Sequence, residues 1–246
     1  MTAHYPSASV LRESYLSVSI ATLIVLLWFL TAYGSLFVLP NVKEMALMPV
    51  VGVMTVRAFL HTGLFILAHD AMHGTLMPAY PKVNDWVGQA ILRLYSFLSF
   101  QQMRDCHNQH HRTPAQSTDP DFYPGNFIAW YIHFMRTYIR DGQGAVIFWG
   151  MSFFFYPLLL IFHVPLFNAV LFWLLPQALS SLQLFYFGTY RPHKRPNGGH
   201  INAHRATSSN AAPLLSFLSC YHFDYHWEHH QYPHLPWYKL PSAHIR

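Results

Sequence analysis

Four long apolar runs constrain the fold of this 246-residue chain more than any other feature. A helix needs about 20 apolar residues to cross a hydrocarbon core of about 30 Å, where each backbone polar group must find its partner within the protein. The runs of about this length are residues 15–39, 45–68, 145–162 and 166–187. They predict an all-α membrane protein with four transmembrane helices, folded as a single domain over residues 1–246.

The stretch between the second and third runs, residues 85–103, is amphipathic and includes Arg93. We expect it to form an interfacial helix that lies on the membrane surface or re-enters it. Only 10% of the residues are charged, against roughly 25% in soluble domains, which agrees with a chain in lipid. Arg57 interrupts the second run and either snorkels in a shifted span or bonds backbone carbonyls. Pro176 predicts a kink in the fourth.

The basic residues orient the predicted spans. Four crossings place the N-terminus, the segment between runs two and three, and the tail on one side of the membrane. Six basic residues fall in that middle segment and six in the tail, whereas only Lys43 lies on the opposite face. The positive-inside rule makes the first side cytoplasmic. The net charge of +5 is therefore a topology signal with anionic lipid contact, and it indicates no nucleic-acid partner.

Three histidine clusters carry the chemistry, and all fall on the predicted cytoplasmic side. They are His69 with His73, then His107, His110 and His111, then His226, His229 and His230. Residues three and four apart share one face of a helix, so each cluster presents its imidazoles together. Eight imidazoles exceed the four ligands of a structural zinc site and suit two metal ions with room for a small ligand. We expect a cytoplasmic cap that gathers these clusters just above the membrane.

Further polar residues lie near the clusters. His222 stands one helical turn before His226 and is predicted as a ninth ligand, and His204 is a further candidate, ahead of His193. Ligating histidines usually donate their second N–H to a carboxylate or carbonyl, a task we assign first to Asp70 and Glu228. The other acidic residues close to the clusters are Asp105, Asp119, Asp121 and Asp224.

Imidazole ligands alone do not choose the metal, because zinc, copper, nickel and iron all accept them. The His-Glu-x-x-His run of hydrolytic zinc sites is missing from the sequence, which disfavours hydrolysis. A pair of redox metals that activates oxygen toward an unreactive C–H bond fits a membrane-held substrate better. A membrane metal carrier is a rival hypothesis, but a carrier would place its ligands within the spans.

The order HDxxH, HxxHH, HxxHH on a four-span chain resembles the membrane fatty acid desaturase and hydroxylase superfamily of non-haem di-iron proteins. The flanking residues resemble its CrtW-type β-carotene ketolases. These motifs are HDAMHGT at 69–75, HHRTPAQSTDPDF at 110–122, FGTYRPH at 187–193 and HWEHHQYPHLPWYKLP at 226–241. The resemblance implies two iron ions, molecular oxygen as co-substrate, and the eight clustered histidines as iron ligands.

The resemblance also implies a function. A β-carotene 4-ketolase inserts a keto group at C4 of the β-ionone ring by two hydroxylations and a dehydration, giving echinenone and then canthaxanthin. Alternatives within the superfamily are a carotenoid ring 3-hydroxylase and an acyl-lipid desaturase or hydroxylase. The chain shows no dinucleotide fingerprint and no iron–sulfur cysteine set, so electrons are expected from a reduced ferredoxin-like protein. The expected location is an inner, plasma or thylakoid-type membrane, with the active site on the cytoplasmic face.

Overall fold

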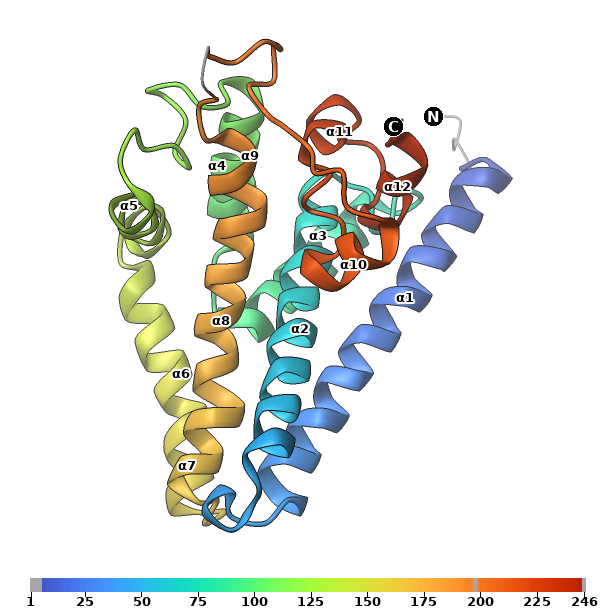
Figure 1. Ribbon diagram of the computed structural model, residues 1–246. Helices are drawn as coiled ribbons and strands as arrows, with labels where there is room; N and C mark the ends of the chain where they lie inside the picture. The colour runs from blue at the N-terminus through green and yellow to red at the C-terminus, as the bar shows by residue number, and fades with distance from the viewer. Residues whose placement is uncertain (1–5, 197–198, 245–246) are drawn as a thin grey trace.

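The computed structural model describes residues 6–196 and 199–244, which form helices and connecting turns without a strand (Figure 1). The long helices are α1 (Ala8–Tyr33), α2 (Leu47–Met72), α3 (Pro81–Ser96), α4 (Phe100–Arg112), α5 (Phe127–Ile139), α6 (Gln143–Leu160) and α8 (Leu175–Leu184). The short ones are α7 (Leu166–Ala169), α9 (Arg191–His193), α10 (Pro213–Cys220), α11 (His226–Gln231) and α12 (Leu240–Ala243).

The prediction of four membrane-spanning helices is confirmed by length and composition. The four are Ala8–Val38, Leu47–Met72, Gln143–Leu160 and Leu166–His193. They run along the molecule in Figure 1, and the first turn of α1 lies at the end that carries α11 and α12. The two short connections, residues 39–46 and 161–165, lie at the opposite end.

The fourth span accommodates Pro176 without breaking. A π-helical turn at Val170–Leu174 precedes α8, and Pro176 occupies the first turn of that helix. Proline has no backbone N–H, so the helix loses one hydrogen bond at Pro176. The π-helical turn just before it has already shifted the hydrogen-bonding register, and the proline is tolerated at this position. A second π-helical turn, Phe185–Tyr190, joins α8 to α9. The span therefore continues to His193, well beyond the predicted end at residue 187.

The segment at 85–103 differs from the expectation of one amphipathic helix. The chain breaks at Phe97, whose φ is 56°, and α4 then starts afresh at Phe100. Gln143 satisfies the backbone at this break, because its Nε2–H donates to the Phe97 carbonyl at 2.9 Å and its Oε1 accepts from the Ser99 N–H at 3.1 Å. Helix α3 is tied to α2 through Asn84, whose Nδ2–H donates to the Ala71 carbonyl at 2.8 Å. Its place at the interface stays a prediction.

Arg57 holds three spans together. Its side chain is 1% exposed. Its Nη1 donates to the carbonyl of Trp28 in α1 at 2.8 Å, and its Nε donates to the carbonyl of Phe172, in the turn before α8, at 3.2 Å. Of the two readings that the sequence left open, the structure shows the bonding of backbone carbonyls.

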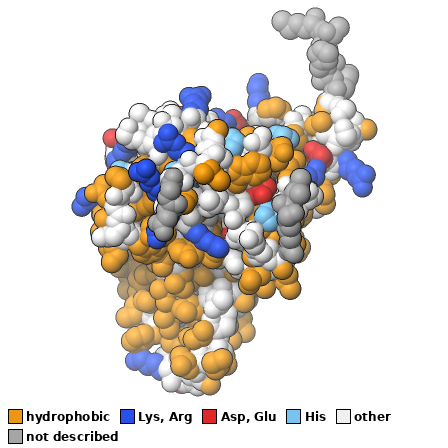
Figure 2. Space-filling model, turned by 45° about the horizontal axis from the view of Figure 1, so that its top comes forward, with side chains coloured by type: hydrophobic (Ala, Val, Ile, Leu, Met, Phe, Trp, Pro, Cys, Tyr) orange, Lys and Arg blue, Asp and Glu red, His pale blue; other side chains and the backbone are white. Residues whose placement is uncertain are grey.

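The surface separates into two zones. Figure 2 shows hydrophobic side chains over the narrower end and most of the visible Lys and Arg side chains at the broader end. Apolar residues on the long helices remain exposed, such as Trp149 at 70% and Phe153 at 73% on α6. Such a large apolar surface is costly in water and is what a bilayer covers.

Candidate metal centre

Four separate elements bring nine histidines together. The end of α2 supplies His69 and its C-terminal cap His73, and α9 supplies His193 at the end of the fourth span. Helix α4 supplies His107, His110 and His111, and α11 supplies His226, His229 and His230. The predicted helical presentation of both His-x-x-His-His clusters is confirmed.

Eight of the nine divide into two groups of four. Group one is His69, His73, His107 and His229, and group two is His110, His193, His226 and His230. Within each group, one nitrogen from every histidine lies within 4.8 Å of the others.

His111 joins the two groups. Its Nε2 lies 3.1 Å from His107 Nε2 and 2.9 Å from His229 Nε2, so it extends group one. Its ring stacks on that of His230 in group two, with centroids 4.2 Å apart. Group one thus has five imidazoles within reach and group two has four.

The spacing of the nitrogens fits shared cations. Two nitrogens that each lie about 2.1 Å from one metal ion are roughly 3.0 to 3.4 Å apart. In group one, His73 Nε2 lies 2.8 Å from His107 Nε2. In group two, His226 Nε2 lies 3.0 Å from His193 Nε2 and 3.1 Å from His230 Nε2. A neutral imidazole nitrogen offers one hydrogen or one lone pair, so His226 Nε2 cannot bond both neighbours. A cation would satisfy these converging lone pairs.

Two of the second nitrogens in group two have partners that leave the other ring nitrogen free for a metal ion. His193 Nδ1–H donates to the Arg205 carbonyl at 2.9 Å, which leaves its Nε2 with a lone pair toward the group. His110 Nδ1 lies 2.9 Å from the carboxylate of Asp119, a buried partner that fixes the ring in the same sense. In group one, both ring nitrogens of His69 are buried without any partner. Such orphaned nitrogens are rare unless a ligand satisfies them.

Electrostatics keep most of these rings neutral. Burial, reinforced by the neighbouring imidazoles, holds the pKa of His107, His111 and His229 well below the usual value. The pKa values of His226 and His230 are lowered for the same reasons. Burial alone would also lower the pKa of His110, but the hydrogen bond to Asp119 and its charge outweigh it and raise that pKa. Neutral imidazoles are the ligand-competent form.

The structure does not bring His222 into either group. The expected helix from His222 to His226 is wrong, because Tyr221 and His222 have φ values of 49° and 64° and end α10 before α11 begins. His222 Nδ1 instead lies 3.0 Å from Ser216 Oγ, whose hydroxyl donates to Asp224. His204 also lies outside the groups, with its Nε2 3.0 Å from Gln231 Oε1.

The two carboxylates predicted to support ligands contact other partners. The Asp70 carboxylate accepts the backbone N–H of Trp237 at 3.3 Å, and the nearest approach to His69 Nδ1 is 4.0 Å. Glu228 accepts from Ser208 Oγ–H and lies 2.7 Å from His244 Nδ1. Both hold the C-terminal segment in place, and their part in the reaction stays a prediction. Within residues 6–196 and 199–244, Asp119 is the carboxylate that hydrogen-bonds a clustered histidine.

His193 belongs to group two, although the sequence analysis placed it behind His204 as a candidate ligand. It stands alone in the chain, so no spacing marked it. The FGTYRPH motif that ends at His193 was the available signal.

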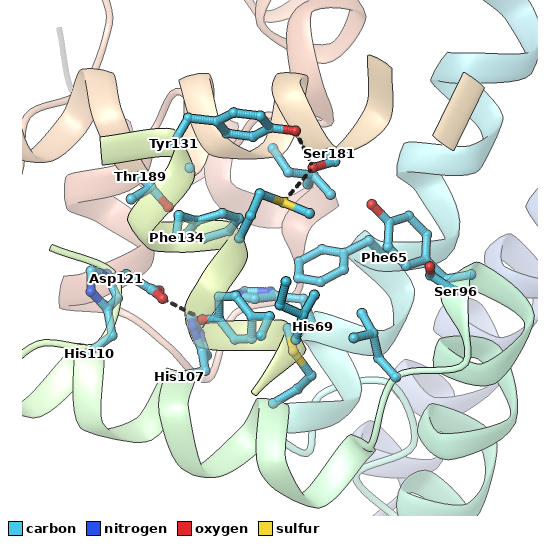
Figure 3. A pocket seen from close by; sticks show the side chains of 18 of the residues that line it. Phe65, His69, Ser96, His107, His110, Asp121, Tyr131, Phe134, Ser181 and Thr189 are labelled. Atoms are coloured by element: carbon cyan, nitrogen blue, oxygen red, sulfur yellow. Dashed lines mark hydrogen bonds between the residues drawn. The ribbon is translucent and has the colours of Figure 1, made fainter. Parts of the chain in front are cut away.

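An apolar cavity opens onto both groups (Figure 3). This space, cavity A, has a volume of about 310 Å³. Its wall includes His69 and His107 of group one and His110 and His226 of group two. Most of the remaining wall is apolar, with Phe65, Met72, Leu98, Met103, Phe134, Leu184 and Phe223. Asp121 and Tyr138 form a hydrogen-bonded pair in the same wall.

Fold and site together define a helical protein with four candidate membrane spans and a two-part histidine centre beside an apolar cavity. The chain belongs to the fatty acid desaturase family, whose model matches residues 44–156 and 127–246. The family resemblance inferred from the histidine motifs is thereby confirmed.

Several curated relatives within this family have names that describe carotenoid ketolases. A zeaxanthin 4-ketolase of Chlamydomonas reinhardtii is 40% identical over 246 residues, which cover 94% of this chain and 54% of that protein. A β-carotene ketolase of Haematococcus lacustris is 38% identical over 206 residues, covering 80% and 63%. A β-carotene ketolase of Paracoccus sp. (strain PC1) is 33% identical over 238 residues, covering 94% and 93%. The chain spans less than two thirds of the length of either algal relative.

Proposed function

We propose that this protein is a β-carotene 4-ketolase. The observation that carries the proposal is cavity A, an apolar space whose wall contains histidines of both groups. Relatives named β-carotene ketolase or zeaxanthin 4-ketolase support a carotenoid as the substrate. An apolar polyene needs such a cavity to bring its ring beside a polar centre.

The metal proposed for the centre is iron, one ion in each group. Group one with His111 would hold one ion, and group two would hold the other. When bound, the pair supplies the activation of molecular oxygen that hydroxylation of an aliphatic C–H bond requires. The converging nitrogens and the buried unpartnered nitrogens of His69 support a metal-loaded centre.

The chain itself positions and shields the reacting carbon. Each hydroxylation at C4 consumes one O₂, two electrons and two protons, replaces one C–H by C–OH and releases one water. The second gives a geminal diol, which loses water to form the ketone. We assign Asp121 and Tyr138, bonded to each other in the cavity wall, to hydrogen bonding with these hydroxyl groups. The apolar remainder of cavity A excludes bulk water.

The broader, basic end of the molecule is proposed to face the cytoplasm. The basic residues gathered at this end (Figure 2) support that orientation. The same surface suits an acidic electron donor, because complementary charge speeds the encounter of two proteins. We propose a reduced ferredoxin-like protein as that donor.

Product analysis tests the function. Expressed in cells that make β-carotene, the protein is expected to yield echinenone and canthaxanthin, identified by chromatography and mass. Zeaxanthin as the product would indicate the ring 3-hydroxylase instead, and unsaturated or hydroxylated acyl chains would indicate the acyl-lipid enzyme. A purified protein that carries zinc without iron and leaves every carotenoid unchanged would favour the metal carrier.

Filling cavity A should block the reaction without removing the metals. Leu184 on α8 is 6% exposed and lines the cavity, so Leu184→Trp places a larger ring where the polyene would lie. We expect at least about a 10-fold loss of ketocarotenoid with unchanged iron content, since overpacking costs only about 1–3 kcal/mol. Leu182 on the same helix is 38% exposed, and Leu182→Trp is the matched control. Equal product from L184W and the wild type would remove cavity A from the mechanism.

A further inference from the structure

A second cavity lies deeper among the spans. This space, cavity B, has a volume of about 240 Å³ and is lined by residues of α1, α2, α3, α6 and the start of α8. Tyr95 and Gln177 belong to the walls of both cavities, so cavity B adjoins cavity A there. Nothing in the proposed ketolase reaction uses its polar residues.

The polar side chains of cavity B are rich in hydrogen-bond donors. The wall includes Arg57, Arg93, His61, Trp173 and Gln177, and it includes no Asp or Glu. Trp28 Nε1–H donates to His61 Nδ1 at 3.1 Å, so His61 carries its own hydrogen on Nε2. Neither His61 Nε2 nor Trp173 Nε1 makes a regular hydrogen bond, although both are buried. The Tyr95 carbonyl lies close enough to interact with the His61 ring, but it does not meet the geometry of a regular hydrogen bond to Nε2.

Arg57 adds a charge that lacks a counter-ion. None of the ion pairs among the described residues includes it. Its Nε and Nη1 serve carbonyls and the Thr31 hydroxyl, while its Nη2 takes part in none of these bonds. A buried cation without a counter-ion is costly, and the cost falls when an anion is bound beside it.

We propose that cavity B binds the carboxylate of a long apolar acid, whose chain extends past Tyr95 toward cavity A. Arg57 is twelve residues from His69 on α2, a rise of about 18 Å. An extended chain advances roughly 1.2 Å per bond, so about fifteen bonds connect the two levels. A fatty acid has this reach, and so does an acid derived from a carotenoid cleaved near its middle. Either would compete with a polyene for the segment that the two cavities share.

Binding to the purified, iron-loaded protein in detergent tests this without any reading of activity. The probes are radiolabelled palmitate, retinoic acid and the methyl ester of each. We expect saturable binding of about one acid per chain, and binding of the esters at least about 10-fold weaker. The acid that binds more tightly identifies the source. Esters that bind as well as the acids, or acids that do not bind, would overturn the proposal.

Variants distinguish a loss of acid binding at cavity B from a loss of folding. Arg57→Gln should weaken acid binding at least about 10-fold, which is about 1.4 kcal/mol. Because Arg57 also joins three spans, Arg93→Gln is the second variant, and it removes the exposed cation of the cavity wall. Lys82→Gln, at an exposed position on the same helix α3, is the matched control. If R93Q binds the acid with full affinity, and R57Q is folded and binds it with full affinity too, the proposal is also contradicted.

Discussion

Replacing His193 with Ala is expected to abolish ketocarotenoid formation as completely as replacing His226. Both rings belong to group two, and their Nε2 atoms lie 3.0 Å apart. Loss of either leaves three nitrogens for the second metal ion. We expect at least about a 100-fold loss of product, beyond the 10–100-fold cost of a residue that merely supports a ligand, and about one iron per chain instead of two. Elemental analysis and chromatography of carotenoids measure both.

The matched control for His193 is His222. It is buried and was expected from the sequence to be a ligand, but its Nδ1 lies beside Ser216 Oγ, away from both groups. His222→Ala should keep two irons per chain and most of the product. The opposite ranking, with H222A losing iron and H193A keeping it, would contradict the assignment of group two.

Asp119→Asn is expected to have the next largest effect. The carboxylate of Asp119 accepts backbone N–H groups from Ala115 at 2.8 Å and Asp121 at 2.9 Å, besides its contact with His110 Nδ1. An amide replaces one acceptor with a donor among these donors, so His110 loses its orientation. Iron affinity and product should fall about 10–100-fold. Measurements of iron retention against a chelator and of product report the two effects.

Asp105 provides the control for this change. It lies on α4 with His110, is exposed, and accepts from Gln101 Nε2–H at 2.9 Å. Asp105→Asn should leave iron and product unchanged. A D119N protein that holds iron as tightly as the wild type would show that the His110 ring is oriented by packing alone.

The lengths of the apolar runs and the spacing of the histidines predicted much of the fold. Runs of apolar residues gave the four spans, because the bilayer imposes one length and one way to satisfy the backbone. The His-x-x-His-His spacing placed three imidazoles on one face of α4 and of α11, because the helical repeat leaves no other arrangement. Span length and helical spacing are local properties, and local properties can be predicted from a sequence.

The division of the histidines into two groups could not be predicted from the sequence. On α4, His107 belongs to group one and His110 to group two, and α11 divides His229 from His226 in the same way. Which side of a helix face meets which neighbour depends on how the helices pack, and spacing does not encode that. The error at His222 has a local cause: two residues with positive φ end α10, and neither is a glycine that would have marked the turn.

The docking of the C-terminal segment has a consequence for how the protein is made. Trp237 bonds Asp70 on α2, Tyr238 Oη lies 2.9 Å from Ser17 Oγ on α1, and Lys239 pairs with Glu13. These contacts fasten the segment bearing α11 to the first two spans, which leave the ribosome long before it does. A nascent chain with all its spans inserted still lacks an imidazole of group one and two of group two. Loading of the proposed irons is therefore expected to be a late step, after the segment bearing α11 has packed against α1 and α2.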